Sequence, residues 1–162
     1  MKTYFETFAR YNAWANQRLY EAVAEVPDAQ YREDRGAFFG SLHGTLNHIL
    51  VGDRAWFTRI TGDGTSPASL DQILCDDFTT LRQARTAEDD RIIRVIGGLD
   101  EAQLAGTIKY RNMRGDHMEQ PLTQVLAHVF NHQTHHRGQA HTLLSQMGRE
   151  APALDLVYFL RD

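Results

Sequence analysis

The chain has 162 residues, of which 42% are hydrophobic and 23% charged, so we expect a single folded domain over residues 1–162 rather than a disordered or fibrous protein. With 17 Lys and Arg against 21 Asp and Glu, the net charge of -4 argues against nucleic-acid binding. No apolar run reaches the roughly 18 residues that a membrane-spanning helix needs, and the N-terminus lacks a basic segment followed by an apolar one. We therefore expect a cytoplasmic protein without membrane partners.

The only cysteine, Cys75, cannot form an internal disulfide or a metal site of several thiolates. A single cysteine also agrees with a reducing compartment. Any metal ion must therefore be held by nitrogen and oxygen atoms.

Apolar residues recur at helical spacing in four stretches of the chain. The first stretch covers residues 8–26 and is closed by Pro27. The second covers residues 42–60, with Ser41 as its N-terminal cap and a cluster of glycines, Ser66 and Pro67 after it. Both stretches predict amphipathic helices.

The third predicted helix begins near Leu70, continues to Ile96 and ends at two glycines. Residues 99–120 indicate a crossover with a short hairpin. The fourth helix is predicted from Pro121, as its first residue, to Gly148. The tail, residues 152–162, is expected to pack on the outside through Leu156, Tyr158, Phe159 and Leu160.

Four helices with few strand signals predict an all-α four-helix bundle, in which the long stretch before the last helix is a crossover connection.

Five of the eight histidines lie within fourteen consecutive positions of the last predicted helix: His128, His132, His135, His136 and His141. At about 100° per residue, His136 lies about 40° to one side of His132 and His128 about 40° to the other, on the apolar face of the helix. His141 lies about 180° away and is expected in solvent.

Two imidazoles four positions apart on one helix face can bind the same ion. The residue after His132 is not the glutamate of a metalloprotease helix, which argues against peptide hydrolysis by that route. The alternative is a pair of core histidines that are hydrogen-bonded to backbone or side chains.

A third ligand is predicted on the second helix. His48 lies on its core face among the small residues Gly44, Val51, Gly52 and Ala55, whereas His43 is turned about 140° away and is assigned to the surface or the cap. Three neutral imidazoles suit zinc, nickel or a similar divalent ion and leave a position for a water or a substrate atom. Such an ion lowers the pKa of a coordinated thiol or water.

These motifs resemble the damage-inducible DinB-like family, and the resemblance covers nearly the whole chain. It rests on three groups of residues: Tyr11, Asn12, Ala13, Trp14, Ala15, Asn16 and Leu19; Leu46, Asn47, His48, Ile49, Asp53 and Trp56; and His128, Asn131, His132, His135, His136, Arg137, Gly138, Gln139 and Leu144. The resemblance implies an up-down-down-up bundle, often dimeric, with metal ligands at His48, His132 and His136. Relatives in this family include metal-dependent transferases that use thiols such as mycothiol and bacillithiol.

The leading hypothesis is a thiol S-transferase in which a divalent ion, zinc or nickel, binds a low-molecular-weight thiol as thiolate, and the thiolate attacks a small electrophile. The alternatives are a hydrolase that uses metal-bound hydroxide and a non-enzymatic, stress-associated metal-binding dimer. A homodimer and a small-molecule substrate are the expected partners.

Other residues of the motif have simpler interpretations. His128 and His135 are interpreted as hydrogen-bonded core or groove histidines, with pocket walls or partners of the ligands as the alternative. Arg137 is assigned to an interhelical or surface ion pair and Gly138 to a helix contact. The aromatic residues of the first helix, Tyr4, Phe5, Phe8, Tyr11 and Trp14, are assigned to the core.

Overall fold

The structure is a computed structural model that describes residues 1–161; Asp162, the end of the predicted tail, lies outside the described residues. Its elements, in chain order, are α1 (Lys2–Val23), α2 (Asp28–Arg32), α3 (Leu42–Thr61), α4 (Phe78–Gly98), α5 (Glu101–Leu104), β1 (Thr107–Arg111), β2 (His117–Pro121), α6 (Leu122–Gln146) and α7 (Leu156–Phe159). None of the described helices is both long and apolar enough to cross a membrane.

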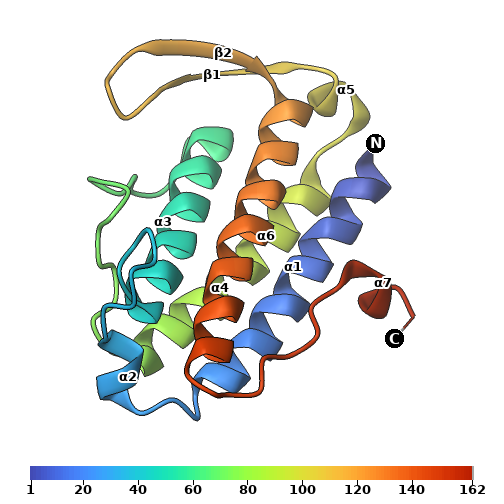
Figure 1. The fold of residues 1–162 in the computed structure, drawn as a ribbon. Helices are drawn as coiled ribbons and strands as arrows, with labels where there is room; N and C mark the ends of the chain where they lie inside the picture. Colours follow the sequence, from blue (N-terminus) through green and yellow to red (C-terminus); the bar gives the residue numbers. More distant parts are fainter. Residues whose placement is uncertain (162) are drawn as a thin grey trace.

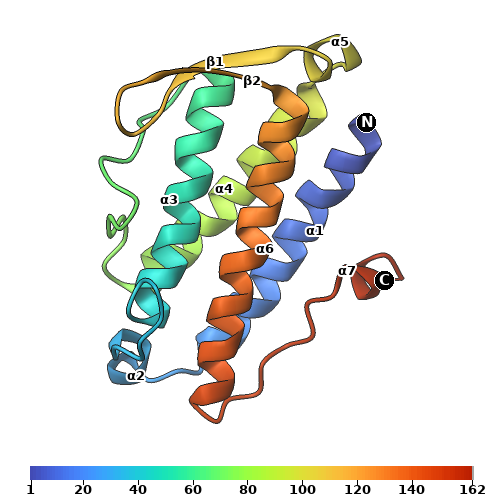
Figure 2. The same cartoon turned by 45° about the horizontal axis from the view of Figure 1, so that its top comes forward.

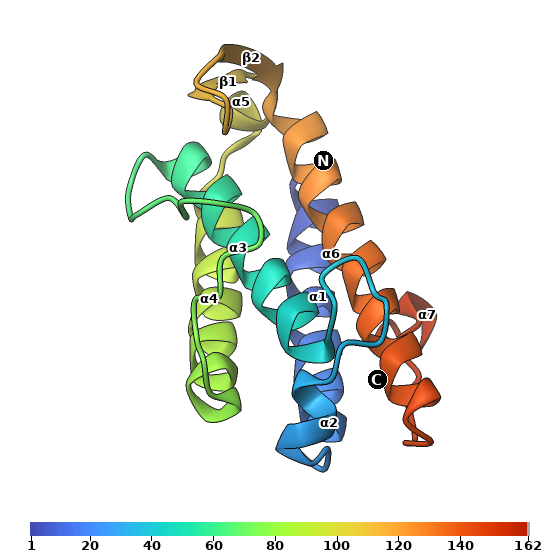
Figure 3. The same cartoon turned by 60° about the vertical axis from the view of Figure 1, so that its left-hand side comes forward.

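The four long helices, α1, α3, α4 and α6, form the predicted all-α, up-down-down-up bundle (Figure 1). α1 and α6 run in one direction and α3 and α4 in the other (Figure 3). α1 packs against α4 and α6, and α3 packs against the same two helices, so α1 and α3 are diagonal partners, as are α4 and α6. The α3–α6 pair carries the histidines.

Three long connections join the four long helices, and the first of them, residues 24–41, carries α2. The crossover predicted at residues 99–120 occupies residues 99–121; it crosses one end of the bundle from α4 to α6 and carries α5 and the hairpin of β1 and β2 (Figure 2). The hairpin is antiparallel, from Thr107 opposite Pro121 to Arg111 opposite His117. Residues 62–77 run back along the bundle, because α3 and α4 point in the same direction (Figure 3).

The start of the third predicted helix was wrong by eight residues, because α4 begins at Phe78 and not near Leu70. Asp77 caps α4 by accepting a hydrogen bond from the Thr80 backbone N–H at 2.8 Å. The segment before it is held by Asn47 of α3, whose amide oxygen accepts from the backbone N–H groups of Leu74 (2.9 Å) and Cys75 (3.0 Å). A side chain of α3 thus satisfies backbone groups that a helix would otherwise use.

Smaller boundary errors have similar causes. Pro121 pairs as the last residue of β2 and precedes α6, so it is the N-cap and not the first helical residue. The tail packs on α1 through Phe159, whose ring lies 5.8 Å from that of Trp14 and 6.0 Å from that of Tyr11. Tyr158 and Leu160 are exposed, contrary to the prediction. Among the predicted core aromatics, Tyr4 is also exposed.

The core consists of two apolar clusters, one towards each end of the bundle. Along every long helix, buried polar residues lie between the stretches that supply the two clusters: Asn12 and Asn16 on α1, Asp53 on α3, Arg85 and Asp89 on α4, and Gln133 and Arg137 on α6. We call this set the polar layer. It lies at the same level of α3 and α6 as the predicted metal ligands.

Candidate metal centre

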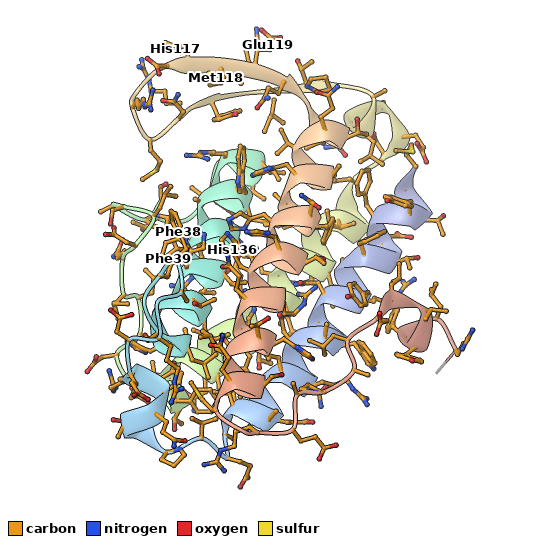
Figure 4. All side chains as sticks on the ribbon, viewed as in Figure 1. Phe38, Phe39, His117, Met118, Glu119 and His136 are labelled. Carbon is orange, nitrogen blue, oxygen red and sulfur yellow. The ribbon has the colours of Figure 1, made fainter. Side chains whose placement is uncertain are left out.

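The three predicted ligands meet between α3 and α6. One ligand nitrogen from each of His48, His132 and His136 lies within 4.8 Å of the other two. The closest pair joins His48 Nε2 to His132 Nε2 at 3.1 Å. Figure 4 shows His136 between α6 and α3, with Phe38 and Phe39, from the loop that precedes α3, beside it.

Hydrogen bonds to the outer ring nitrogens set the orientation of two of these imidazoles. His48 Nδ1 lies 2.7 Å from the carbonyl oxygen of Leu70, to which it donates. His136 Nδ1 lies 2.8 Å from Oε1 of Gln139 and donates to that amide oxygen. Because each neutral ring then carries its proton on Nδ1, the Nε2 lone pairs of His48 and His136 are free for an ion.

This donor set fits a divalent ion that prefers imidazole. Zinc–nitrogen bonds of about 2.0–2.1 Å in a tetrahedron place the nitrogens about 3.3 Å apart, close to the 3.1 Å between His48 and His132. In residues 1–161, no further His, Cys, Asp or Glu joins this group. No ring of the cluster donates to an oxygen atom through more than one of its nitrogens. The cluster therefore differs from core histidines whose two ring nitrogens are both satisfied by ordinary hydrogen bonds.

Close packing holds the rings in place. A Cβ atom at Gly52 would lie 2.7 Å from Cε1 of His132, so the absence of a side chain there makes room for this ring. The ring of Phe39 stacks on that of His48 with their centroids 3.7 Å apart. Gly44, predicted to be a neighbour of His48, instead makes room for the backbone of Phe39, whose carbonyl oxygen a Cβ would approach to 2.1 Å.

Burial keeps the three imidazoles neutral. The pKa of His48 is lowered to about 4, mainly by burial; the hydrogen bond to Leu70 partly opposes this shift, and the neighbouring His136 adds to it. Burial, followed by the other histidines, lowers the pKa of His132 to about 3. The pKa of His136 is also lowered, mainly by burial. Neutral imidazole is the form that binds metal.

We call His48, His132 and His136 the triad. The remaining histidines lie outside it. His128 and His135 are exposed at its edge, with ring centroids 5.8 Å from His132 and 4.7 Å from His136 respectively. His43 was assigned to the surface or the cap, but it is buried and its ring lies 5.1 Å from that of Tyr31. His141, expected in solvent, is half-buried, with Nε2 3.1 Å from the carbonyl oxygen of Pro152.

Two further assignments on α6 change. Arg137 is buried, as an interhelical contact requires, but it donates to the amide oxygens of Asn12 and Asn16 rather than to a carboxylate. Gly138 was assigned to a helix contact, yet a Cβ there would meet no atom within 4 Å. Gly138 therefore faces open space.

The polar layer lies directly behind the triad. Gln133, next to His132, donates to Asp53 at 2.7 Å, and Asp53 also accepts from Arg85 at 2.5 Å. Arg85 also forms an ion pair with Asp89 at 2.9 Å. Asp89 in turn accepts hydrogen bonds from Asn12 and Asn16 of α1. Hydrogen bonds thus connect α1, α3, α4 and α6 at the level of the candidate site.

Sequence reasoning did not assign the groups that orient the ligands. The role of the Leu70 carbonyl could not be predicted from the sequence, because every residue of that loop has a backbone carbonyl oxygen. Gln139 and Asn47 were visible as members of the motif, and Gln139 lies three positions after His136, a spacing at which helical side chains meet. Phe39 lies in a loop and follows no periodic pattern.

Comparison with known proteins agrees with this architecture. The sequence profile of the DinB family matches the chain over residues 1–162. Protein DinB of Bacillus subtilis (strain 168) is 26% identical over 156 residues, which cover 93% of this chain and 90% of that protein. The crystal structure of a DinB-like protein from Bacillus cereus ATCC 10987 superimposes with a TM-score of 0.68 and 16% identity over 90% of this chain and 94% of the other, which supports the fold.

Proposed function

The chain belongs to the DinB family, and we propose that it is a metal-dependent thiol S-transferase whose ion, zinc or nickel, is held by His48, His132 and His136. The observation that carries the proposal is the convergence of these rings, two of them oriented by hydrogen bonds at Nδ1. Family membership and the histidine cluster are both compatible with metal binding.

The cysteine of the chain is a poor candidate for the nucleophile. Cys75 is buried, and burial raises the pKa of its thiol, so it is a poor source of thiolate. When bound, the ion supplies Lewis acidity that lowers the pKa of an external thiol. In the proposed reaction a carbon–sulfur bond forms, the bond from carbon to its leaving group breaks, the leaving group departs with the electron pair, and the thiol proton goes to solvent.

An aromatic wall next to the triad supports a flat electrophile. The ring of Trp56 lies 5.2 Å from His128 and 5.3 Å from Tyr110 of the hairpin. The guanidinium of Arg59 lies 4.7 Å from the ring centre of Trp56, and His128 lies 5.8 Å from His132. Because Arg59 covers one face of Trp56, a flat, electron-poor ring would contact Trp56 at its other face or its edge.

Metal analysis tests the first half of the proposal. Protein purified without an affinity tag is expected to hold about one ion per chain, and His48→Ala and His132→Ala are expected to lose it. His117→Ala is the matched control, because His117 is exposed on β2 at the end of the bundle, away from His136 (Figure 4). If the two ligand variants hold as much metal as the parent, the metal centre is refuted.

Turnover tests the second half. Bacillithiol, mycothiol or glutathione, each supplied with a halogenated nitroaromatic compound, is expected to give a thioether and free halide at equal rates. No thiol-dependent turnover with any pairing would refute the transferase. Halide release without thiol would instead support the hydrolase, and an inert ion whose removal only lowers the melting temperature would support the non-enzymatic binding protein.

A further inference from the structure

A second pocket lies beside the candidate metal centre. It has a volume of about 440 Å³ and opens between the loop before α3, with Arg35 and Phe38, and the middle of α6, with His135, Gly138 and Gln139. This volume falls within the range of about 300–1,000 Å³ that is usual for small-molecule sites. None of the described residues that line this pocket belongs to the triad.

The pocket shares a wall with the triad. Gln139 lines the pocket and accepts the hydrogen bond from His136 Nδ1 at 2.8 Å, while its amide nitrogen lies 3.3 Å from Nε2 of His135, another lining residue. On the opposite wall, Phe38 precedes Phe39, whose ring stacks on that of His48. A molecule in the pocket is therefore separated from His136 by one residue, Gln139, and from His48 by two, Phe38 and Phe39.

The lining favours a ligand with an anionic group. The chain as a whole carries a net charge of -4, yet the described residues that line this pocket include Arg35 and no Asp or Glu. The Arg35 side chain is partly exposed, but its Nε is covered by protein atoms and has no hydrogen-bond partner in the described part of the chain, so a ligand can meet only its terminal nitrogens. Its Nη2 pairs with Glu33 at 2.5 Å, but Glu33 is exposed, so a ligand carboxylate can replace this weak surface pair.

A larger cavity, of about 530 Å³, lies between α1 and α4, but its lining does not favour an anionic ligand. It is lined by Arg82 and Arg85 but also by Asp89 and Asp90, so its charges balance. Arg85 is already engaged by Asp53 and Asp89 of the polar layer. The pocket beside the triad is therefore the better anion site.

We infer that this pocket binds the body of the thiol substrate, and that Arg35 pairs with a free carboxylate of that thiol while its sulfur reaches the ion at the triad. The inference rests on the proposed function and narrows its substrate class to low-molecular-weight thiols that carry a carboxylate. Bacillithiol and glutathione belong to this class; mycothiol and the diethyl ester of glutathione carry no free carboxylate.

Gly138 permits a test that leaves the ligands untouched. Gly138 lines the pocket and a Cβ there meets no atom within 4 Å, so a leucine at this position adds bulk at the pocket wall without displacing a neighbour at its Cβ. Gly97→Leu is the matched control, because Gly97 is also an exposed helical glycine with free space around a Cβ, but lies at the end of α4. Arg35→Gln removes the proposed carboxylate partner, and Arg111→Gln removes an exposed charge of the same sign on the hairpin.

The experiment is a titration of the Co²⁺-loaded proteins with the four thiols, followed by the thiolate-to-cobalt charge-transfer band. Cobalt content and circular dichroism of each variant are measured first. Gly138→Leu is expected to raise the Kd of bacillithiol and glutathione at least tenfold, and Arg35→Gln to do the same. Gly97→Leu and Arg111→Gln should bind as the parent does, and the two thiols without carboxylates should bind the parent more weakly and ignore Arg35→Gln.

Failure of this inference and failure of the proposed function give different results. If the parent shows the band but Arg35→Gln and Gly138→Leu bind carboxylate thiols as tightly as the parent, the assignment of the pocket is overturned and the metal centre stands. If the cobalt-loaded parent shows no band with any thiol, the proposed function itself is overturned, and the pocket assignment with it.

Discussion

Replacing Gly52 with alanine is expected to lower the affinity for metal without lowering the stability of the metal-free protein. The substitution therefore separates metal binding from folding stability. The new Cβ would lie 2.7 Å from Cε1 and 3.2 Å from Nδ1 of His132. The ring must therefore move by about 0.7 Å to reach an ordinary contact of 3.4 Å. Since metal sites tolerate ligand distances only within about 0.2 Å, this displacement weakens the bond from His132 to the ion.

The expected loss of metal affinity is 10- to 100-fold, or about 1.4–2.7 kcal/mol, the range found when groups that orient a ligand are altered. The metal-free protein behaves differently, because an unbound imidazole can turn aside at little cost. In addition, alanine is favoured over glycine within a helix by about 1 kcal/mol. We therefore expect metal-free Gly52→Ala to be at least as stable as the metal-free parent.

Competition with a chromogenic zinc chelator measures the affinity, and urea unfolding in EDTA measures the stability. Gly97→Ala is the control, because a Cβ there meets nothing within 4 Å; it should show the gain in helix propensity without a change in zinc affinity. Parent-like zinc affinity in Gly52→Ala would refute the assignment of His132 as a ligand in this geometry. A large loss of stability in EDTA would refute the claim that the glycine serves the metal rather than the core.

Three further outcomes are expected. Asn47→Ala removes the hydrogen bonds that hold residues 74 and 75, and should lower the free energy of unfolding by about 2–3 kcal/mol in urea titrations. Asp53→Ala leaves the buried guanidinium of Arg85 without this partner and should cost about 3–5 kcal/mol, whereas Asp63→Ala, at an exposed ion pair, should leave stability near that of the parent in the same titration. In EDTA, stability should fall as the pH decreases from about 6.5 towards about 4, because the unfolded chain takes up a proton at His48 that the folded chain, with its pKa lowered to about 4, does not. Urea midpoints that stay constant over this pH range would contradict the last expectation.

The features that could be predicted from the sequence are those set by periodicity on a single helix. The spacing of His132 and His136 fixes their shared face on α6, and the apolar stripe of α3 places His48 towards the core, so the three rings were expected to meet. Conversely, α4 was predicted too early because Leu70, Ile73 and Leu74 follow helical spacing. Side chains of α3 hold this segment as a loop, and such tertiary contacts override local propensity.

The polar layer escaped prediction for a related reason. Asn12, Asn16 and Asp53 were recognised only as parts of a motif, because an isolated polar residue on a helix suggests solvent exposure. Their burial becomes favourable only when partners from the other helices satisfy each amide and carboxylate, and these partners are up to 125 positions away in the chain. No pattern within one helix carries that information.

The polar layer also explains why the three imidazoles meet. Hydrophobic packing alone allows α6 to turn or slide against α3 at modest cost, because many apolar residues fill a core almost equally well. Asp53 and Gln133 are direct neighbours of Gly52 and His132 in the sequence, and their 2.7 Å hydrogen bond specifies one register of the two helices. A shift of one residue turns α6 by about 100° and would leave both buried groups unpaired while it carries His132 away from His48. The register that satisfies the buried carboxylate is thus the one that brings the imidazoles together.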